Sequence, residues 1–341
     1  MLIIFSVYIY TVIRFQRYIT RSTHHHLTSL ITYNSTMGSL TIPKLLVVDF
    51  TNDNLTPGTT TWSSTCNDIR VALENHGCFI ALYNGVSTKL QESVFQAADE
   101  LFDLPTETKI KNIVSKPYHG YVGQMPIVPL HEGLGIDYAT DHEGAQSFTN
   151  LIETSMLFSR AVKELENMVI KMIFESYGVG KYSDSHMDST TYLLRYLKYR
   201  APEMNETTMA FPSHTDKSFL TILHQNQVSG LEIRARNEEW ISVEYPPSSF
   251  VVMAGDACKA WSNDRVLSPN HKVTMDKHGK ETRYTIALFS FLSKKVEVPD
   301  ELVDYEHPLK FKAFDHVDLL NYYVTENGRK SQNILQDFCG V

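Results

Sequence analysis

The chain has 341 residues, 43% of them hydrophobic and 21% charged, a composition typical of a soluble globular protein. The formal net charge of -8 excludes nucleic acid as the main partner, because no basic surface is available to neutralise phosphates. Its four cysteines form no Cys-x-x-Cys pair, which favours reduced thiols in the cytoplasm over a disulfide framework.

The N-terminus differs from the rest of the chain. Residues 1–13 are almost wholly apolar, but this run is too short to span a bilayer and no basic region precedes it. We therefore expect no stable membrane insertion and predict a disordered extension over residues 1–42 of a cytoplasmic protein. Organelle targeting by residues 1–36, and their removal from the mature protein, stay open.

The N-terminal half predicts two strand–helix pairs followed by a long loop. The predicted elements are a strand over Pro43–Phe50, a helix over Ser64–Asn75, a strand over Cys78–Tyr83 and a helix from Ser87 to Pro105. Residues 115–144 are rich in Gly, Pro and His without periodicity, and a loop of this length usually lines or covers a site. We expect its histidines not to be metal ligands; they are His119, His131 and His142.

Helical spacing then gives way to strands. Apolar residues recur every three or four positions over Phe148–Tyr177, which predicts a long helix. Short strands follow, separated by turn signals, and a helix over Phe311–Thr325 closes the chain. The predicted strands are Tyr192–Tyr199, Phe219–His224, Leu231–Ala235, Glu239–Val243, Phe250–Met253, Lys272–Met275 and Tyr284–Leu292. This pattern indicates an α+β fold with a mainly β core, a jelly-roll barrel with N-terminal helices packed on it.

One His-x-Asp pair stands where it could bind an ion. His214 and Asp216 precede an apolar strand, and residues two apart on a strand point to one face. With a later histidine, His271, they would leave half of an octahedral ion open, as in non-haem Fe(II) oxygenases. We expect no ion at the other two pairs: His186/Asp188 has a turn-forming composition, and His316/Asp318 diverge on a predicted helix.

Several motifs together resemble the Fe(II)/2-oxoglutarate-dependent dioxygenases, in particular the plant class that modifies small metabolites and its AOP-type branch. The resemblance covers nearly everything from Pro43 onward. It rests on the His214 motif and on the segments Leu73–Phe79, Phe102–Lys109, Gly144–Asn150, Gly255–Asp256, Trp261–Asn263, Ser268–His271 and Arg283–Thr285.

The resemblance implies a double-stranded β-helix barrel and a set of site residues. The implied metal and catalytic ligands are His214, Asp216 and His271, and the implied 2-oxoglutarate-binding residues are Arg283, Thr285 and Tyr199. Arg283 and Thr285 share a strand face, and a guanidinium fork suits a carboxylate. A surface ion pair is the alternative role for Arg283. The connection near Leu151 resembles a shortened form of the family's, a departure that could perturb a site wall.

The resemblance also divides the chain and implies a reaction. After the extension it implies an N-terminal α/β region over 43–180, a catalytic core over 181–310 and a C-terminal helix and tail over 311–341. We predict a monomeric oxidoreductase of secondary metabolism that uses Fe(II), 2-oxoglutarate and O2, with ascorbate as reductant. It would hydroxylate, desaturate or dealkylate a small metabolite with release of succinate and CO2.

Three alternatives stay open. The first is an Fe(II) oxidase of the same fold that does not use 2-oxoglutarate. The second is a catalytically impaired barrel, and the third is a zinc hydrolase, for which no Glu stands near the motif as a general base. For the substrate wall, our candidates are Tyr118, Tyr121, Met253 and Phe291.

Overall fold

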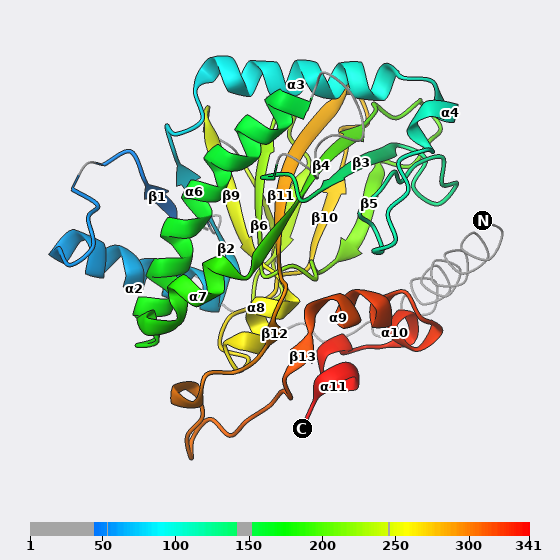
Figure 1. Cartoon of the computed structure of the whole chain (residues 1–341). Coiled ribbons are helices and arrows are strands. Elements are labelled where there is room, and N and C mark those ends of the chain that lie inside the picture. Colours follow the sequence, from blue (N-terminus) through cyan, green and yellow to red (C-terminus); the bar gives the residue numbers. More distant parts are fainter. Residues whose placement is uncertain (1–43, 53, 142–151, 245) are drawn as a thin grey trace, which may run out of the picture.

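Two β-sheets form the centre of the molecule (Figure 1). A computed structural model describes residues 44–52, 54–141, 152–244 and 246–341. The large sheet runs, in spatial order, through β1 (Val47–Asp49), β2 (Cys78–Leu82), β9 (Ser249–Ala254), β6 (Leu220–Gln225), β11 (Arg283–Leu292), β4 (Thr190–Tyr199) and β3 (His131–Asp137). The small sheet runs through β5 (Met209–His214), β10 (His271–Thr274), β7 (Leu231–Arg234) and β8 (Trp240–Ser242).

An apolar core lies between the two sheets. Val251 and Met253 of the large sheet share this core with Ile233 and Ile241 of the small sheet. Side chains alternate along each strand, so Tyr196 of β4 instead joins the core on the outer face. Two facing sheets closed over a shared core make the jelly-roll, double-stranded β-helix arrangement, which confirms the predicted fold class.

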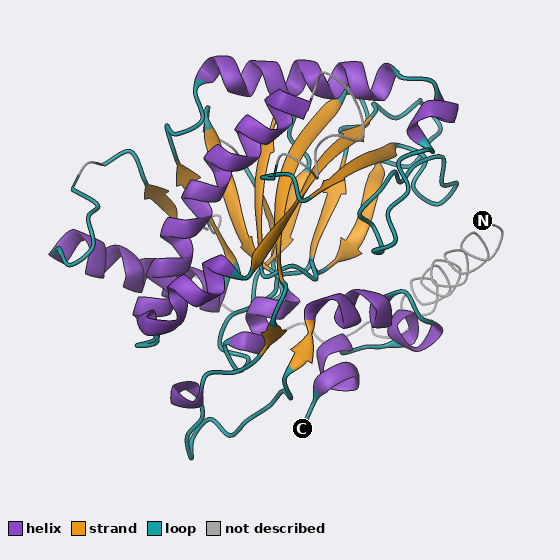
Figure 2. Cartoon of the chain, in the orientation of Figure 1, coloured by secondary structure: helices purple, strands orange, loops and turns teal. Residues whose placement is uncertain are grey.

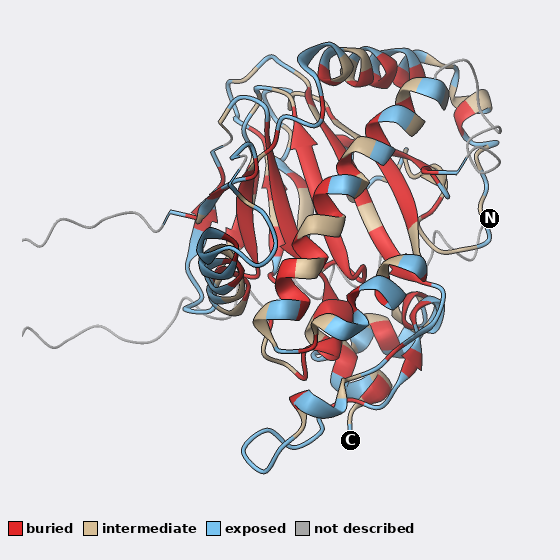
Figure 3. Cartoon of the chain, turned by 60° about the vertical axis from the view of Figure 1, so that its left-hand side comes forward, coloured by how far each residue is buried: buried red, intermediate tan, exposed pale blue. Residues whose placement is uncertain are grey.

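The outer face of the large sheet is covered by helices, with α6 (Ile152–Ser176) lying across it (Figure 2). The predicted spacing of apolar residues is confirmed, since Phe158, Val162, Leu165 and Val169 are all buried there. Helices α2 (Thr60–Asn75) and α3 (Thr88–Asp103) pack on α6 in turn. Figure 3 shows the result: buried strands, and helices exposed on their outer sides.

Short elements complete the fold. They are α4 (Thr106–Lys109), η1 (Gly180–Tyr182), α7 (Ser183–Asp188), α8 (Asp256–Trp261), β12 (Lys295–Val296), η2 (Asp300–Leu302), β13 (Phe314–Asp315), α9 (His316–Tyr323), α10 (Glu326–Lys330) and α11 (Ile334–Cys339). No helix in the described ranges is both long enough and apolar enough to cross a bilayer. All four cysteines are buried free thiols.

The structure corrects several predicted elements. Residues 115–144 are not a loop throughout, because β3 lies within them and pairs with β4. The turn-forming stretch around His186 is the short helix α7. The C-terminal helix begins at His316 and not at Phe311, since Phe314 and Asp315 pair with β12.

Helix α2 starts four residues before the predicted Ser64. The hydroxyl of Thr59 accepts a hydrogen bond of 3.1 Å from the amide of Trp62 and caps the helix there. Residues 1–42, His142 and the connection at Leu151 lie outside the described residues, and the proposed domain boundaries stay predictions.

Candidate metal and co-substrate site

Three side chains converge at one end of the barrel. His214 ends β5 and His271 opens β10, and the two residues are paired across the small sheet. The Nε2 atoms of both histidines lie 3.8 Å from Oδ1 of Asp216. All three ligand atoms fall within 4.8 Å of one another, so one metal ion could be held between them. The rest of its coordination sphere would stay open.

The reason we gave for this convergence is wrong in part. His214 and Asp216 do not share a strand face, because Asp216 lies in the turn between β5 and β6. That turn brings the carboxylate back toward the imidazole. The hydroxyl of Thr221, in β6, donates a hydrogen bond of 2.7 Å to Oδ2 of Asp216 and leaves Oδ1 for an ion.

Both imidazoles are oriented by backbone carbonyl groups. Nδ1 of His214 lies 2.9 Å from the carbonyl oxygen of Pro212, and Nδ1 of His271 lies 3.3 Å from that of Pro269. With the proton on Nδ1, Nε2 faces the site as a ligand. Burial, with the nearby His271, lowers the pKa of His214 to about 3, so its ring is neutral, as a metal ligand must be.

A buried arginine with unused donors lies on the barrel-facing side of β11. Arg283 is 1% exposed, and its Nη2 donates a hydrogen bond of 2.7 Å to Gln225. Its Nε and Nη1, and the hydroxyl of Thr285, are buried without hydrogen-bond partners among the described residues. Its guanidinium carbon lies 5.2 Å from the ring centroid of Tyr199. Buried unpaired donors are costly, so these groups fit an anionic ligand such as a dicarboxylate.

A buried ion pair supports the turn that carries Asp216. Nζ of Lys217 lies 2.7 Å from Oδ2 of Asp256, which opens α8, and 2.8 Å from the carbonyl oxygen of Thr215. The hydroxyl of Thr215 also donates to Asp256. Our sequence reasoning quoted Gly255–Asp256 as part of the resemblance but gave it no role.

The histidines of the other two His-x-Asp pairs make contacts of a different kind. His186 packs on the rings of Phe174 and Phe219. His316 accepts a hydrogen bond from the amide of Leu292 and donates one to the carbonyl oxygen of Lys217. Within the described ranges, neither joins a cluster that could hold a metal ion.

Two of the four side chains that we predicted for the substrate wall lie in other parts of the molecule. The hydroxyl of Tyr121 donates to Glu132 (2.6 Å) while its ring packs against the outer core, and Met253 belongs to the apolar core between the sheets. Phe291 instead lies between His119 and His316, with ring centroids 5.2 and 5.0 Å away.

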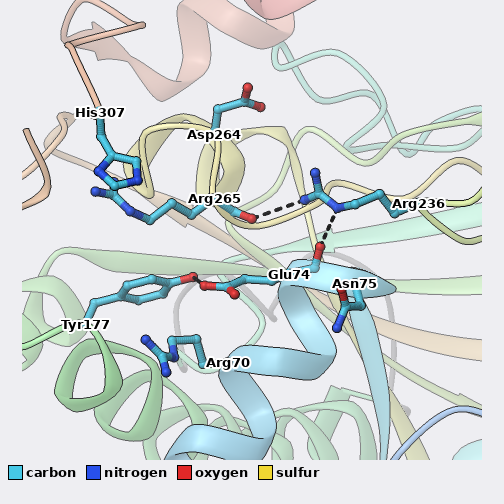
Figure 4. Close-up of a pocket in the computed structure, with 8 residues that line it drawn as sticks. All are labelled: Arg70, Glu74, Asn75, Tyr177, Arg236, Asp264, Arg265 and His307. Atoms are coloured by element: carbon cyan, nitrogen blue, oxygen red, sulfur yellow. Dashed lines mark hydrogen bonds between the residues drawn. The ribbon is translucent and has the colours of Figure 1, made fainter. Parts of the chain in front are cut away.

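A cavity of about 530 Å³ lies outside the barrel (Figure 4). Arg236 and Arg265 are held there by backbone carbonyl oxygens, and the hydroxyl of Tyr177 donates to Glu74. None of the triad residues lines this cavity, so its volume is no guide to the reaction.

The fold and this site define a class of protein. The chain matches the model of the 2OG-Fe(II) oxygenase superfamily over residues 189–291. It also matches the non-haem dioxygenase in morphine synthesis N-terminal model over residues 46–138. The chain belongs to the 2OG-Fe(II) oxygenase family and is a 2-oxoglutarate-dependent dioxygenase, an oxidoreductase.

Within this family the chain is of the plant AOP type. It is 43% identical to the probable 2-oxoglutarate-dependent dioxygenase AOP1.2 of Arabidopsis thaliana, over 86% of this chain and 95% of that protein. It is 31% identical to the probable inactive dioxygenase AOP2 of the same plant, over 89% and 99%. Among solved structures, the rice dioxygenase for auxin oxidation superposes with a TM-score of 0.74 at 27% identity, over 87% and 100%.

Proposed function

We propose that His214, Asp216 and His271 bind Fe(II) in this protein. The proposal is supported by the donor set, two imidazoles and one carboxylate, and by the separations of 3.8 Å between the imidazole Nε2 atoms and Oδ1 of Asp216. The carbonyl groups at Nδ1 and the hydroxyl of Thr221 would keep each ligand atom directed at the ion.

We further propose that Arg283, Thr285 and Tyr199 hold the distal carboxylate of 2-oxoglutarate. The observation that carries this assignment is the pair of buried Arg283 nitrogens that have no partner among the described residues. A guanidinium presents parallel N–H groups that match the two oxygens of a carboxylate. Because the site is buried, this pairing is stronger than it would be in water.

The reaction we propose is the oxidation of a small specialised metabolite by O2, coupled to conversion of 2-oxoglutarate to succinate and CO2. When bound, the iron and co-substrate supply the oxidising chemistry, and the protein binds, orients and excludes water. Hydroxylation, desaturation and dealkylation all fit this site. We assign ascorbate the role of keeping the iron reduced.

A catalytically impaired barrel is the second candidate. One AOP2 relative is named "probable inactive", whereas two other AOP2 proteins of the same plant are named without that qualifier. In addition, the alignment with AOP1.2 has 312 positions. It includes 86% of this 341-residue chain, which is fewer residues than the alignment has positions, so AOP1.2 has residues that this chain lacks. A shortened connection near Leu151, outside the described residues, would be one place for such a loss.

Succinate formation tests the proposal. The full chain is incubated with Fe(II), 2-oxoglutarate, ascorbate, O2 and a panel of plant metabolites. We expect one metabolite to give equal amounts of succinate and oxidised product, and Asp216→Ala to abolish both. Asp276→Ala, at an exposed aspartate, is the control and should keep both.

The failures differ in meaning. Oxidised product without succinate would support the oxidase that does not use 2-oxoglutarate. If neither product forms and calorimetry finds no binding of Fe(II) and 2-oxoglutarate, the impaired barrel is the better description.

A further inference from the structure

The turn between β5 and β6 is held in place by two helices that come later in the chain. Figure 1 shows α8 and α9 at the end of the barrel where β5 ends. The turn carries Asp216, and both helices contact the next residue, Lys217. Lys217 is 8% exposed. A lysine is seldom buried to this extent unless its charge is paired, so its partners show which parts of the molecule depend on it.

The ammonium group of Lys217 joins the turn to α8. Nζ of Lys217 lies 2.7 Å from Oδ2 of Asp256, and 2.8 Å from both the carbonyl oxygen and the hydroxyl oxygen of Thr215. In the backbone, the amide of Asp256 donates a hydrogen bond of 2.8 Å to the carbonyl oxygen of Asp216. The residues before and after Asp216 are therefore tied to the start of α8 through one side chain, and Asp216 itself through the backbone.

Helix α8 approaches the turn without any side chain between them. A Cβ atom on Gly255 would lie 2.1 Å from the carbonyl oxygen of Ser218, so only glycine fits there. The amide of Gly255 donates a hydrogen bond of 3.0 Å to the carbonyl oxygen of Phe219, and the amide of Ala257 donates one of 3.3 Å to that of Ser218. The start of α8 therefore follows the turn from Asp216 to Phe219, and the two move together.

Helix α9 contacts the same lysine with both of its ends. Tyr323 is the last residue of α9, and Nζ of Lys217 lies 4.5 Å from the centroid of its ring, within the range of a cation–π interaction. His316 is the first residue of α9, and its Nε2 donates a hydrogen bond of 2.7 Å to the carbonyl oxygen of Lys217. Helix α9 therefore holds both the ammonium group and the backbone of Lys217.

The same helix is docked on the large sheet. Leu320 of α9 belongs to one buried cluster with Leu193 of β4 and Phe291 of β11. Nδ1 of His316 accepts a hydrogen bond of 3.0 Å from the amide of Leu292, the last residue of β11. Displacement of α9 from the sheet would therefore also remove its contacts with Lys217.

We propose that Lys217 is a positioning residue that couples the turn carrying Asp216 to α9, so that metal binding and docking of α9 stabilise each other. Lys217 would act through the backbone of the turn and not through contact with the ion. Because such coupling is reciprocal, docking of α9 must raise the affinity for the ion by the same factor by which the ion favours the docked helix. This inference rests on the proposed function, since it requires that His214, Asp216 and His271 bind Fe(II).

Anaerobic titration of the full chain with Fe(II) tests the first half of the inference. Lys217→Met keeps the length of the side chain but removes the ammonium group, and we expect Fe(II) affinity to fall about 10- to 100-fold, as for loss of other groups that support a metal ligand. Lys109→Met is the matched control. Lys109 is 5% exposed, pairs with Glu132 at 2.5 Å, and donates to the carbonyl oxygen of Phe102 at 2.8 Å. This variant loses the same kinds of contact elsewhere and should keep the Fe(II) affinity of the parent.

Tyr323 provides a second pair of variants, which is needed because Lys217→Met leaves the carboxylate of Asp256 without its cation, a cost that can unfold the chain. Tyr323→Leu removes the ring face beside Nζ of Lys217, whereas Tyr323→Phe keeps it. We expect Tyr323→Leu to bind Fe(II) more weakly than the parent and Tyr323→Phe to bind it as the parent does. A role in general stability alone would not separate these two variants by metal affinity.

Hydrogen exchange without O2 tests the reciprocal half. In the parent, saturation with Fe(II) should slow exchange of the α9 amides about fivefold or more, while the amides of α3 serve as the reference and should change less than about twofold. Lys109→Met should retain this slowing. Lys217→Met and Tyr323→Leu should lose most of it.

The possible failures are distinguishable. If the parent binds Fe(II) but the ion does not slow exchange in α9 relative to α3, the inference is wrong and the proposed function stands. The same conclusion follows if Lys217→Met and Lys109→Met have equal Fe(II) affinity, or if Tyr323→Leu and Tyr323→Phe do. If the parent does not bind Fe(II), the proposed function fails and the inference fails with it.

Discussion

Both imidazoles of the triad are oriented by the same local geometry, in which Nδ1 faces the carbonyl oxygen of a proline two residues earlier. His119 has this geometry too, at 2.8 Å from the carbonyl oxygen of Pro117, yet it belongs to no metal cluster within the described ranges. The Pro-x-His sequence therefore orients a ring but does not make a site. What distinguishes His214 and His271 is the shared neighbour Asp216.

The hydrogen bond from Thr221 to Asp216 gives the first prediction at this scale. Thr221→Val keeps the shape but removes the donor to Oδ2, so the carboxylate can turn away from the ion. We expect Fe(II) affinity to fall about 10- to 100-fold, the usual effect of losing an outer hydrogen bond to a metal ligand. Titration with Fe(II) under anaerobic conditions measures this change.

Thr274→Val is the matched control for this experiment. Thr274 also donates to a carboxylate in the small sheet, Oε1 of Glu232 at 2.6 Å, but Glu232 is not a ligand. We expect this variant to bind Fe(II) as the parent does. Equal losses in both variants would show that the effect is general destabilisation of the barrel.

The hydroxyl of Thr285 gives a second prediction. It is buried without a partner among the described residues, beside Arg283, so it is available to the co-substrate carboxylate. Thr285→Val should raise the KM for 2-oxoglutarate about 10- to 100-fold, consistent with loss of one hydrogen bond to a charged group, while Thr285→Ser should keep it near the parent value. Initial rates of succinate formation at varied 2-oxoglutarate measure both. An unchanged KM in Thr285→Val would remove this residue from the co-substrate site.

At the scale of elements, the turn between α2 and β2 supports the strand that begins at His271. Gly77, in this turn, has a φ of +69°, and a Cβ atom there would lie 2.4 Å from the carbonyl oxygen of Leu267. It would also lie 2.5 Å from the ring of Pro269, whose carbonyl group orients His271. An N-terminal turn therefore sets the position of His271, the proposed C-terminal metal ligand.

Gly77→Ala should lower the free energy of unfolding and also weaken metal binding. The positive φ alone costs about 1–2 kcal/mol for a residue with a Cβ atom, and displacement of the Leu267–Pro269 backbone adds to this. Gly58→Ala is the control, because Gly58 has a φ of +85° but open space around it. We expect Gly58→Ala to change urea unfolding by the conformational cost alone and to leave Fe(II) affinity unchanged. If the two variants have equal Fe(II) affinity, the turn does not position His271.

The sequence predicts the regular elements well and the local geometry of the site less well. Helix α6 and strand β11 follow clear apolar periods, and both are close to their predicted bounds. Strand β3 was missed because Gly133 and Gly135 interrupt its inward-facing side. Gly133 lies against the guanidinium of Arg195 and Gly135 against the backbone of His119, and neither contact can be read from the sequence. The position of Asp216 depends on a turn closed by Thr221, a contact that strand periodicity does not show.

At the scale of the whole molecule, burial of ionisable groups makes stability depend on pH in two directions. Burial lowers the pKa of His186 to about 3 and that of His316 to about 4. In the unfolded chain these groups bind protons near pH 6.5, so the unfolded state takes up more protons as the pH falls. Stability due to these histidines is therefore lost progressively below about pH 6.5.

Glu166 acts in the opposite direction. This residue of α6 is 1% exposed on the face that packs against the large sheet, and burial raises its pKa to about 8. Between about pH 4.5 and about 8 the folded state holds a proton that the unfolded state has released, so stability falls as the pH rises through this window. Glu166→Gln keeps a neutral side chain of the same shape and should flatten this decline, making the variant more stable than the parent by a few kcal/mol at pH 8.5 and not at pH 5.

Urea unfolding at pH 5, 7 and 8.5 measures the effect. Glu164→Gln is the matched control, since Glu164 is exposed on the same helix and its removal should leave the slope of stability against pH unchanged. A parallel slope in Glu166→Gln and the parent would mean that Glu166 is ionised in the folded protein at neutral pH. In that case the stability of the parent would not fall between pH 5 and pH 8.5 because of Glu166. Helix α6 would then have to accommodate a buried negative charge against the large sheet.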